Sequence, residues 1–277
     1  MTAMMGLKTK LALARTLVWV GLQPSPEVLR ELVGGLCAGR ADVIVLVQPD
    51  ADADDLLLGH RTALQSADGR AILGLAAAGE LARRARADLV AADAVVAPVR
   101  AHDYALTLAV VKQLADLTRS LEDVHVDAVV VTPDLIDPAV ALAPPTAVAS
   151  KPWFAQVDSL AQARALVAAG ARRLALPTIN SQGQLGMSPR QLVDAYRSTL
   201  AEAWRAEMAQ FTFSTLHLGQ QRPPHTLASA RPDGSVPGRP TPDAPPARAP
   251  SHHTPTSEDG DGGWLGGHHE RGPDDHW

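Results

Sequence analysis

Residues 151–176 read KPWFAQVDSLAQARALVAAGARRLAL, and their pattern changes from strand to helix and back to strand. The apolar run Trp153–Gln156 is too short for a helix and predicts a buried strand. Asp158 or Ser159 can cap the Ala/Leu-rich helix that follows. A second apolar run, Arg173–Leu176, begins soon after that helix. The stretch is therefore typical of two parallel strands joined by a crossover helix.

The same alternation extends along the chain between residues 12 and 212. The predicted strands are Leu17–Val20, Val43–Val47, Ala71–Leu75, a run within Leu89–Ala97, Ala128–Val131, Trp153–Gln156 and Arg173–Leu176. Ser25-Pro26 and Ser188-Pro189 each supply an N-cap and a first-turn proline, which predict helices to about Ala38 and Gln210. This order favours an α/β fold, a TIM-type (β/α)8 barrel over an open doubly wound sheet, although periodicity alone does not separate the two.

One segment does not fit a regular barrel. His102–Leu121 carries a broad apolar stripe at helical spacing and predicts a single long helix. That stripe consists of Leu106, Leu108, Val110, Val111, Leu114 and Leu117. The interpretation leaves no fifth strand between Val96 and Ala128, so we expect a barrel that is irregular or lacks one strand, with an exposed edge to be covered.

Composition excludes several classes of protein. The 277 residues are 46% hydrophobic and carry a formal net charge of −5, with no dense block of Lys or Arg, so neither nucleic-acid nor membrane-surface binding is expected. No apolar run approaches the roughly 20 residues of a membrane span. The single cysteine, Cys37, lies in an apolar helical pattern and is predicted to be a core residue. We expect a cytoplasmic protein.

The composition changes abruptly near Gln220. Residues 220–277 hold 11 of the 22 prolines and 6 of the 10 histidines, and their only aliphatic residues are Leu227, Val236 and Leu265. Such a segment buries too little surface to offset its ordering entropy. We therefore divide the chain into an N-terminal extension (1–11), a barrel (12–212) and a disordered tail (213–277). The histidines His252, His253, His268, His269 and His276 suit a metal such as nickel, copper or zinc, but such tails more often have no dedicated site.

Several segments resemble thiamine-phosphate synthases and the related TenI-like proteins, especially those of actinobacterial type. They are Lys151-Pro-Trp-Phe-Ala155, Val167–Leu174, Leu11-Ala-Leu-Ala-Arg15, Gly39-Arg-Ala-Asp-Val-Ile44 and Leu81–Leu89. The resemblance runs in order from residue 11 to about residue 180 and implies a (β/α)8 barrel. It also implies an active site at the C-terminal ends of the strands, where the family joins an aminopyrimidine diphosphate to a thiazole phosphate and releases pyrophosphate with the aid of magnesium.

The positions that would carry this chemistry differ in this chain. Five segments stand where the resemblance implies the cationic, acidic and glycine-rich motifs of the family. They are Val45–Pro49, Ala76–Ala78, residues 91–100 (AADAVVAPVR, ending at Arg100), Thr132–Asp137 and Val157-Asp158. The last replacement stands where the resemblance implies a Gly-Gly phosphate loop. A β-branched side chain and a carboxylate oppose a phosphate by bulk and by charge.

Two functional interpretations follow, with a third in reserve. The first is a catalytically degenerate relative of thiamine-phosphate synthase with a binding or regulatory role. The second is a working synthase whose site is rebuilt from residues such as Gln48, Gln156, Asp158 and Asn180; the third is a barrel for an unrelated small ligand. The first assigns no catalytic or metal-binding residue and no cofactor, and only the second needs magnesium. A small phosphorylated ligand, a protein partner and self-association all stay open.

Three smaller features each have two explanations. Asp50, Asp52, Asp54 and Asp55 suit either a cation site or, more simply, a helix N-terminus. Arg100 suits an anion site or a solvated loop. The string Leu216–Gln220 matches a family motif, but it is out of order and is better explained as coincidence.

Overall fold

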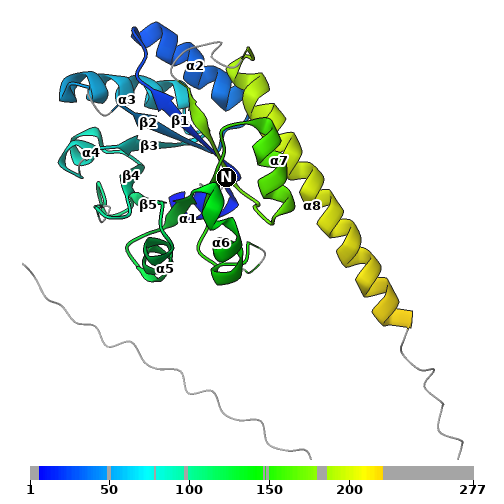
Figure 1. Ribbon diagram of the computed structural model, residues 1–277. Coiled ribbons are helices and arrows are strands. Elements are labelled where there is room, and N and C mark those ends of the chain that lie inside the picture. The colour runs from blue at the N-terminus through cyan, green and yellow to red at the C-terminus, as the bar shows by residue number, and fades with distance from the viewer. Residues whose placement is uncertain are drawn as a thin grey trace, which may run out of the picture. The chain divides into compact units, whose positions relative to one another are not determined.

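The computed structural model describes residues 6–48, 51–77, 79–96, 99–145, 147, 150–179 and 186–220, with side chains described up to residue 205. These residues belong to one compact unit, residues 1–223. Eight parallel strands close into a barrel in chain order, with helices around it (Figure 1). The predicted α/β fold of TIM type is confirmed.

The strands are β1 (Thr16–Gly21), β2 (Val43–Val47), β3 (Ile72–Ala76), β4 (Leu89–Asp93), β5 (Leu106–Val111), β6 (Ala128–Val131), β7 (Trp153–Gln156) and β8 (Leu174–Ile179). The helices are α1 (Leu7–Leu13), α2 (Pro26–Ala38), α3 (Ala53–Ala67), α4 (Gly79–Ala85), α5 (Leu114–Glu122), the 3-10 helix η1 (Pro133–Leu135), α6 (Ile136–Leu142), α7 (Leu160–Ala168) and α8 (Pro189–Gln220).

The prediction of one long helix over His102–Leu121 is wrong, because this segment forms strand β5, a short break and helix α5. β5 pairs with β4 and with β6, so the barrel lacks no strand. Leu106 and Leu108 belong to the cluster inside the barrel, whereas Ala109 and Val111 belong to the cluster between strands and helices. A strand buried on both faces is continuously apolar, and in a short window this resembles a broad helical stripe.

Polar groups at the N-terminal end of the barrel are extensively paired. Asp42, one residue before β2, accepts hydrogen bonds at Oδ2 from the backbone N–H groups of Arg15 and Thr16 and from the Thr16 hydroxyl, each at 2.9 Å. Arg197 of α8 donates to the same oxygen at 2.9 Å. Asp42 thus links β1, β2 and α8 at their base.

The same arrangement recurs before β6. Asp127 accepts a hydrogen bond from the Thr107 N–H at 3.0 Å, and its carboxylate lies 2.9 Å from the Arg100 guanidinium. Arg100 also donates to the Ala105 carbonyl. Arg100 is therefore neither a solvated loop residue nor an anion site, since its side chain is 26% exposed and paired.

The residues that carry the family resemblance are largely structural here. Lys151 donates from Nζ to the carbonyls of Ser120 (2.7 Å) and Asp123 (2.6 Å) at the end of α5. Trp153 is buried and donates from Nε1 to the Ala143 carbonyl at 2.8 Å. This segment therefore fixes the scaffold around β7.

The helix signals are also confirmed. Ser25 caps α2 by accepting a hydrogen bond from the Val28 N–H, and Pro26 is the first residue of the helix. A side chain at Gly39 would place its Cβ 2.8 Å from the Arg190 carbonyl, which explains why glycine ends α2 where it meets α8. Cys37 is buried in the core, as predicted.

Helix α8 begins at Ser188-Pro189 as predicted and continues to Gln220 instead of ending near Gln210. It therefore includes Leu216–Gln220. Among the described residues, no helix is long and apolar enough to cross a membrane. Residues 221–277, with the tail histidines, lie outside the described part of the chain.

Candidate functional site at the C-terminal end of the barrel

Four polar residues lie at or just after the C-terminal ends of neighbouring strands, at positions that continue each strand's row of interior residues. They are Asp93 (β4), Lys112 (after β5), Thr132 (after β6) and Gln156 (β7). Each continues the alternation of residues that line the interior, such as Ala91, Leu108, Val130 and Phe154. Trp19 and Val110 are partly buried against the same interior cluster. The C-terminal opening of the barrel, called the mouth below, therefore has an apolar interior and polar groups along part of its rim.

Asp93 and Lys112 neutralise each other across the ends of β4 and β5. Lys112 Nζ lies 2.9 Å from Asp93 Oδ2. The hydrogen bond from Lys112, helped by one from the Val95 N–H, lowers the pKa of Asp93. Both side chains are exposed, by 65% for Lys112 and 42% for Asp93, so the pair is well hydrated. It presents little net charge to a ligand.

Thr132 is the least satisfied polar group of the mouth. Its Oγ1 is buried and has no hydrogen-bond partner among the described residues. A buried hydroxyl without a partner carries a desolvation cost. It can donate one hydrogen bond to a ligand and accept others.

In the loop between β7 and α7 and the helix turn that follows, side chains accept hydrogen bonds from backbone N–H groups, and below we call this loop closed. The Asp158 N–H donates to Gln162 Oε1 at 2.6 Å, and the Gln162 N–H donates to Ser159 Oγ at 3.2 Å. Ser159, rather than Asp158, is thus the helix cap. Val157 is fully buried, and its N–H is bonded to the Ala175 carbonyl. The N–H groups of Val157, Asp158 and Gln162 are thus bonded within the chain, and Asp158 is exposed just before the helix.

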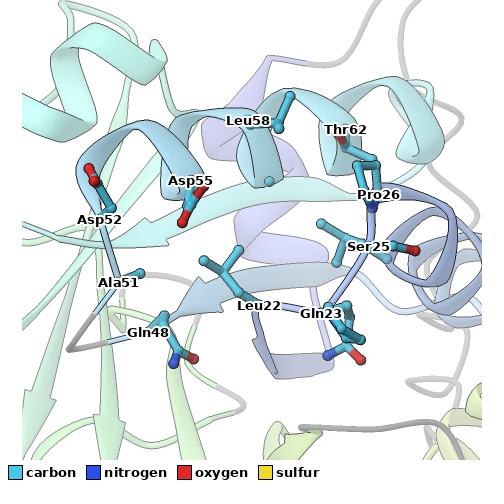
Figure 2. A pocket seen from close by; sticks show the side chains of 13 residues that line it. Leu22, Gln23, Ser25, Pro26, Gln48, Ala51, Asp52, Asp55, Leu58 and Thr62 are labelled. Carbon is cyan, nitrogen blue, oxygen red and sulfur yellow. The ribbon is translucent and has the colours of Figure 1, made fainter.

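A cavity of about 430 Å³ lies beside the mouth, between the loop after β1 and helix α3. Gln23, Ser25, Gln48, Asp55 and Thr62 supply its polar lining, and Leu22, Leu29 and Leu58 its apolar lining. Figure 2 shows Gln23 and Gln48 on the strand side of α3, with Asp55 extending from the helix toward the same space. The thirteen described lining residues include two carboxylates and no cationic side chain.

The acidic segment is confirmed as a helix N-terminus. Asp52 is the N-cap of α3 and accepts a hydrogen bond from the Asp54 N–H at 3.1 Å, while Asp54 and Asp55 lie in the first turn. Asp50 lies outside the described residues. No group of three His, Cys, Asp or Glu side chains within the described chain is arranged to hold a metal ion.

The residues proposed for a rebuilt active site do not meet at one place. Gln48 lines the cavity beside α3, whereas Gln156 ends β7 and Asp158 follows it, three strands away around the closed barrel. Asn180 lies outside the described residues. Asp93, Lys112 and Thr132 were not singled out from the sequence. Recognition of β5 would have placed Lys112 at the end of a barrel strand.

Comparisons with known proteins agree on architecture. A thiamine phosphate pyrophosphorylase from Pyrococcus furiosus superimposes with a TM-score of 0.53 at 16% identity, covering 72% of this chain and 99% of that one. A geranylgeranylglyceryl phosphate synthase from Thermoplasma acidophilum gives 0.53 at 8% identity, covering 72% and 100%. A dihydrodipicolinate synthase from Bacillus anthracis gives 0.52 at 12% identity, covering 71% and 77%.

These likenesses show the barrel fold. At such identities they do not distinguish among the activities of the neighbours. No protein-family model and no curated protein sequence matches the chain.

Proposed function

We propose that this protein is a catalytically degenerate barrel of the thiamine-phosphate-synthase type, with a ligand-binding role in the cytoplasm. The observation that carries the proposal is the closed loop between β7 and α7. Where the resemblance implies glycines that expose backbone N–H groups to a phosphate, the Asp158 and Gln162 N–H groups are bonded within the chain. The exposed Asp158 carboxylate adds repulsion toward an anion.

The electrostatics of the mouth support the same conclusion. Displacement of a diphosphate needs cations or a bound metal to stabilise the leaving group. Lys112 is paired with Asp93, and this pairing also occupies the carboxylate that a magnesium ion would need. This pairing weighs against a magnesium–diphosphate site at the mouth. The proposal includes no resident cofactor.

The cavity beside α3 indicates the class of ligand. Its polar lining consists of amides, hydroxyls and carboxylates, which accept hydrogen bonds from amines and hydroxyls. Its carboxylates disfavour phosphates. A small ligand that is neutral or carries an amine suits this lining, and the Asp55 carboxylate is the natural partner of the amine.

The alternative, a working synthase, is tested by turnover. Purified protein is incubated with the aminopyrimidine diphosphate, the thiazole phosphate and magnesium, and thiamine phosphate is measured by chromatography. We expect no product above a protein-free blank. Product formation that is lost in Asp93→Asn but kept in the exposed control Asp103→Asn would establish the synthase instead.

A further inference from the structure

A second cavity, of about 460 Å³, lies at the opposite end of the barrel between the end of α2 and helix α8. Its lining is dominated by four arginines, Arg15, Arg40, Arg190 and Arg197, together with Asp194 and Ser198. None of these residues belongs to the mouth or to the cavity beside α3.

The fold brings these arginines together from three elements. Arg15 immediately precedes β1, and Arg40 follows α2 with a positive φ of 63°. Arg190 and Arg197 are seven residues apart on α8, so they lie on one face of that helix. Because Gly39 has no side chain, the end of α2 can pack closely against the Arg190 carbonyl of α8. The convergence is therefore part of the packing of the barrel.

Acidic partners balance only part of this positive charge. Arg197 contacts the Asp42 carboxylate at 2.9 Å, and Arg190 lies 3.6 Å from Asp194. Arg15 stacks over the Trp204 ring, 5.4 Å from its centroid. Within the described chain, neither Arg15 nor Arg40 has a carboxylate partner for its guanidinium. The four guanidiniums and two carboxylates leave an excess of two positive charges.

The position of Arg190 adds to this excess. It lies in the first turn of α8, which contains no acidic residue. The N-terminal end of a helix dipole is positive, so a cation there is unfavourable unless an anion is near. Arg197 is meanwhile held in place, because it donates to the Arg40 carbonyl (2.8 Å) as well as to Asp42. Arg197 is thus fixed, whereas Arg40 has no carboxylate partner among the described residues and can turn toward an anion.

We propose that this four-arginine cavity binds a small molecule bearing a diphosphate or a comparable multiply charged phosphate group. Guanidinium groups form paired, charge-assisted hydrogen bonds with phosphate oxygens. A concave site with excess charge favours a multiply charged anion over a monoanion. No carboxylate in the lining is free to bind magnesium, so binding does not require the metal.

The probe is inorganic pyrophosphate, titrated calorimetrically into the full-length protein at low ionic strength with a chelator present. We expect saturable binding that weakens as salt is raised. In the double variant Arg40→Ala/Arg190→Ala, affinity should fall by at least about tenfold, because hydrogen bonds to charged groups are lost. Asp194→Asn, which removes a competing carboxylate, should strengthen binding severalfold.

The matched control is Arg83→Ala/Arg119→Ala. It removes the same total charge from two exposed arginines of α4 and α5 that pair with Glu80 and Asp116. The control should bind pyrophosphate as the natural protein does. Absence of binding to the natural protein, or equal weakening in both double variants, would overturn the proposal. Thermal melting of each variant establishes that it is folded. Because this site shares no residue with the barrel mouth, it is tested independently of the absence of synthase turnover.

Discussion

The two ends of the barrel use polar side chains differently. At the N-terminal end, Asp42 and Asp127 stand one residue before strands β2 and β6, and each holds the backbone of the preceding strand together with an arginine. At the C-terminal end, Asp93 and Lys112 form a hydrated pair, and the Thr132 hydroxyl has no partner among the described residues. Asp42 and Asp127 thus tie strands together at one end, whereas the polar groups at the other end hold no neighbouring strand backbone in this way.

This difference separates stability from function within one fold. In barrels of this type, residues at the N-terminal end are associated with stability, whereas the loops at the C-terminal end carry the chemistry. Substitution of polar groups at the mouth is therefore expected to leave the closed barrel intact. The account predicts that substitutions at the two ends have unequal effects on stability.

The largest difference is expected between Asp127→Ala and Asp93→Ala. Loss of the Asp127 carboxylate removes a partner of Arg100 and of the Thr107 N–H, and for this partly buried pair we expect a cost of about 2–3 kcal/mol, below that of a fully buried one. Loss of an exposed partner such as Asp93 costs below about 1 kcal/mol. Urea unfolding of both variants measures the difference. Equal destabilisation would contradict the contrast between the two ends.

A buried group outside both ends provides the next test. His60 of α3 is 2% exposed, and its Nε2 has no hydrogen-bond partner among the described residues. Burial lowers the pKa of His60 from 6.5 to about 4. The unfolded chain therefore binds a proton that the folded chain excludes, and stability falls as pH drops from about 6.5 toward 4, by up to about 3 kcal/mol.

This pH dependence is measured by urea unfolding between pH 7.5 and 4, with His60→Leu as the comparison. The variant should lose most of the slope in this range. Burial raises the pKa of Asp88, so its contribution has the opposite sign and weakens as pH rises through its folded-state pKa. An unchanged slope in His60→Leu would assign the effect to other groups.

A smaller effect is expected at the loop between β7 and α7. Ser159→Ala removes the cap of α7 and should cost about 1 kcal/mol. Ser25→Ala, which removes the corresponding cap of α2, serves as the matched substitution. Thermal or urea unfolding should give similar losses for the two. A negligible effect at Ser159 alone would mean that its loop is not held closed as described.

Much of the fold follows from local sequence patterns, and the principal error has a physical cause. Ser25-Pro26, Ser188-Pro189 and Gly39 mark helix ends through backbone chemistry, so a single sequence is sufficient to locate them. The segment containing β5 is apolar on both faces, and neither periodicity nor composition distinguishes it from a buried helix. The other differences are smaller: α8 continues to Gln220 instead of ending near Gln210, and Arg100 is paired with Asp127.

The candidate sites were less predictable because they depend on distant parts of the chain. Lys112 gains significance only when β5 is placed next to β4. The four-arginine cavity joins residues 15, 40, 190 and 197, which are unremarkable in sequence. By contrast, the family resemblance drew attention to Val157-Asp158 from the sequence alone. The structure adds that this loop is bonded within itself.

The most direct test of the account is to locate phosphate binding by backbone amide NMR. Labelled protein is titrated with pyrophosphate, with and without magnesium, and shift changes are mapped onto the two ends of the barrel. The account predicts changes near Arg40 and Arg190 in either condition and none from Val157 to Gln162. Magnesium-dependent changes at Asp158 and Gln162 would contradict it, because they would place a working diphosphate site at the C-terminal end.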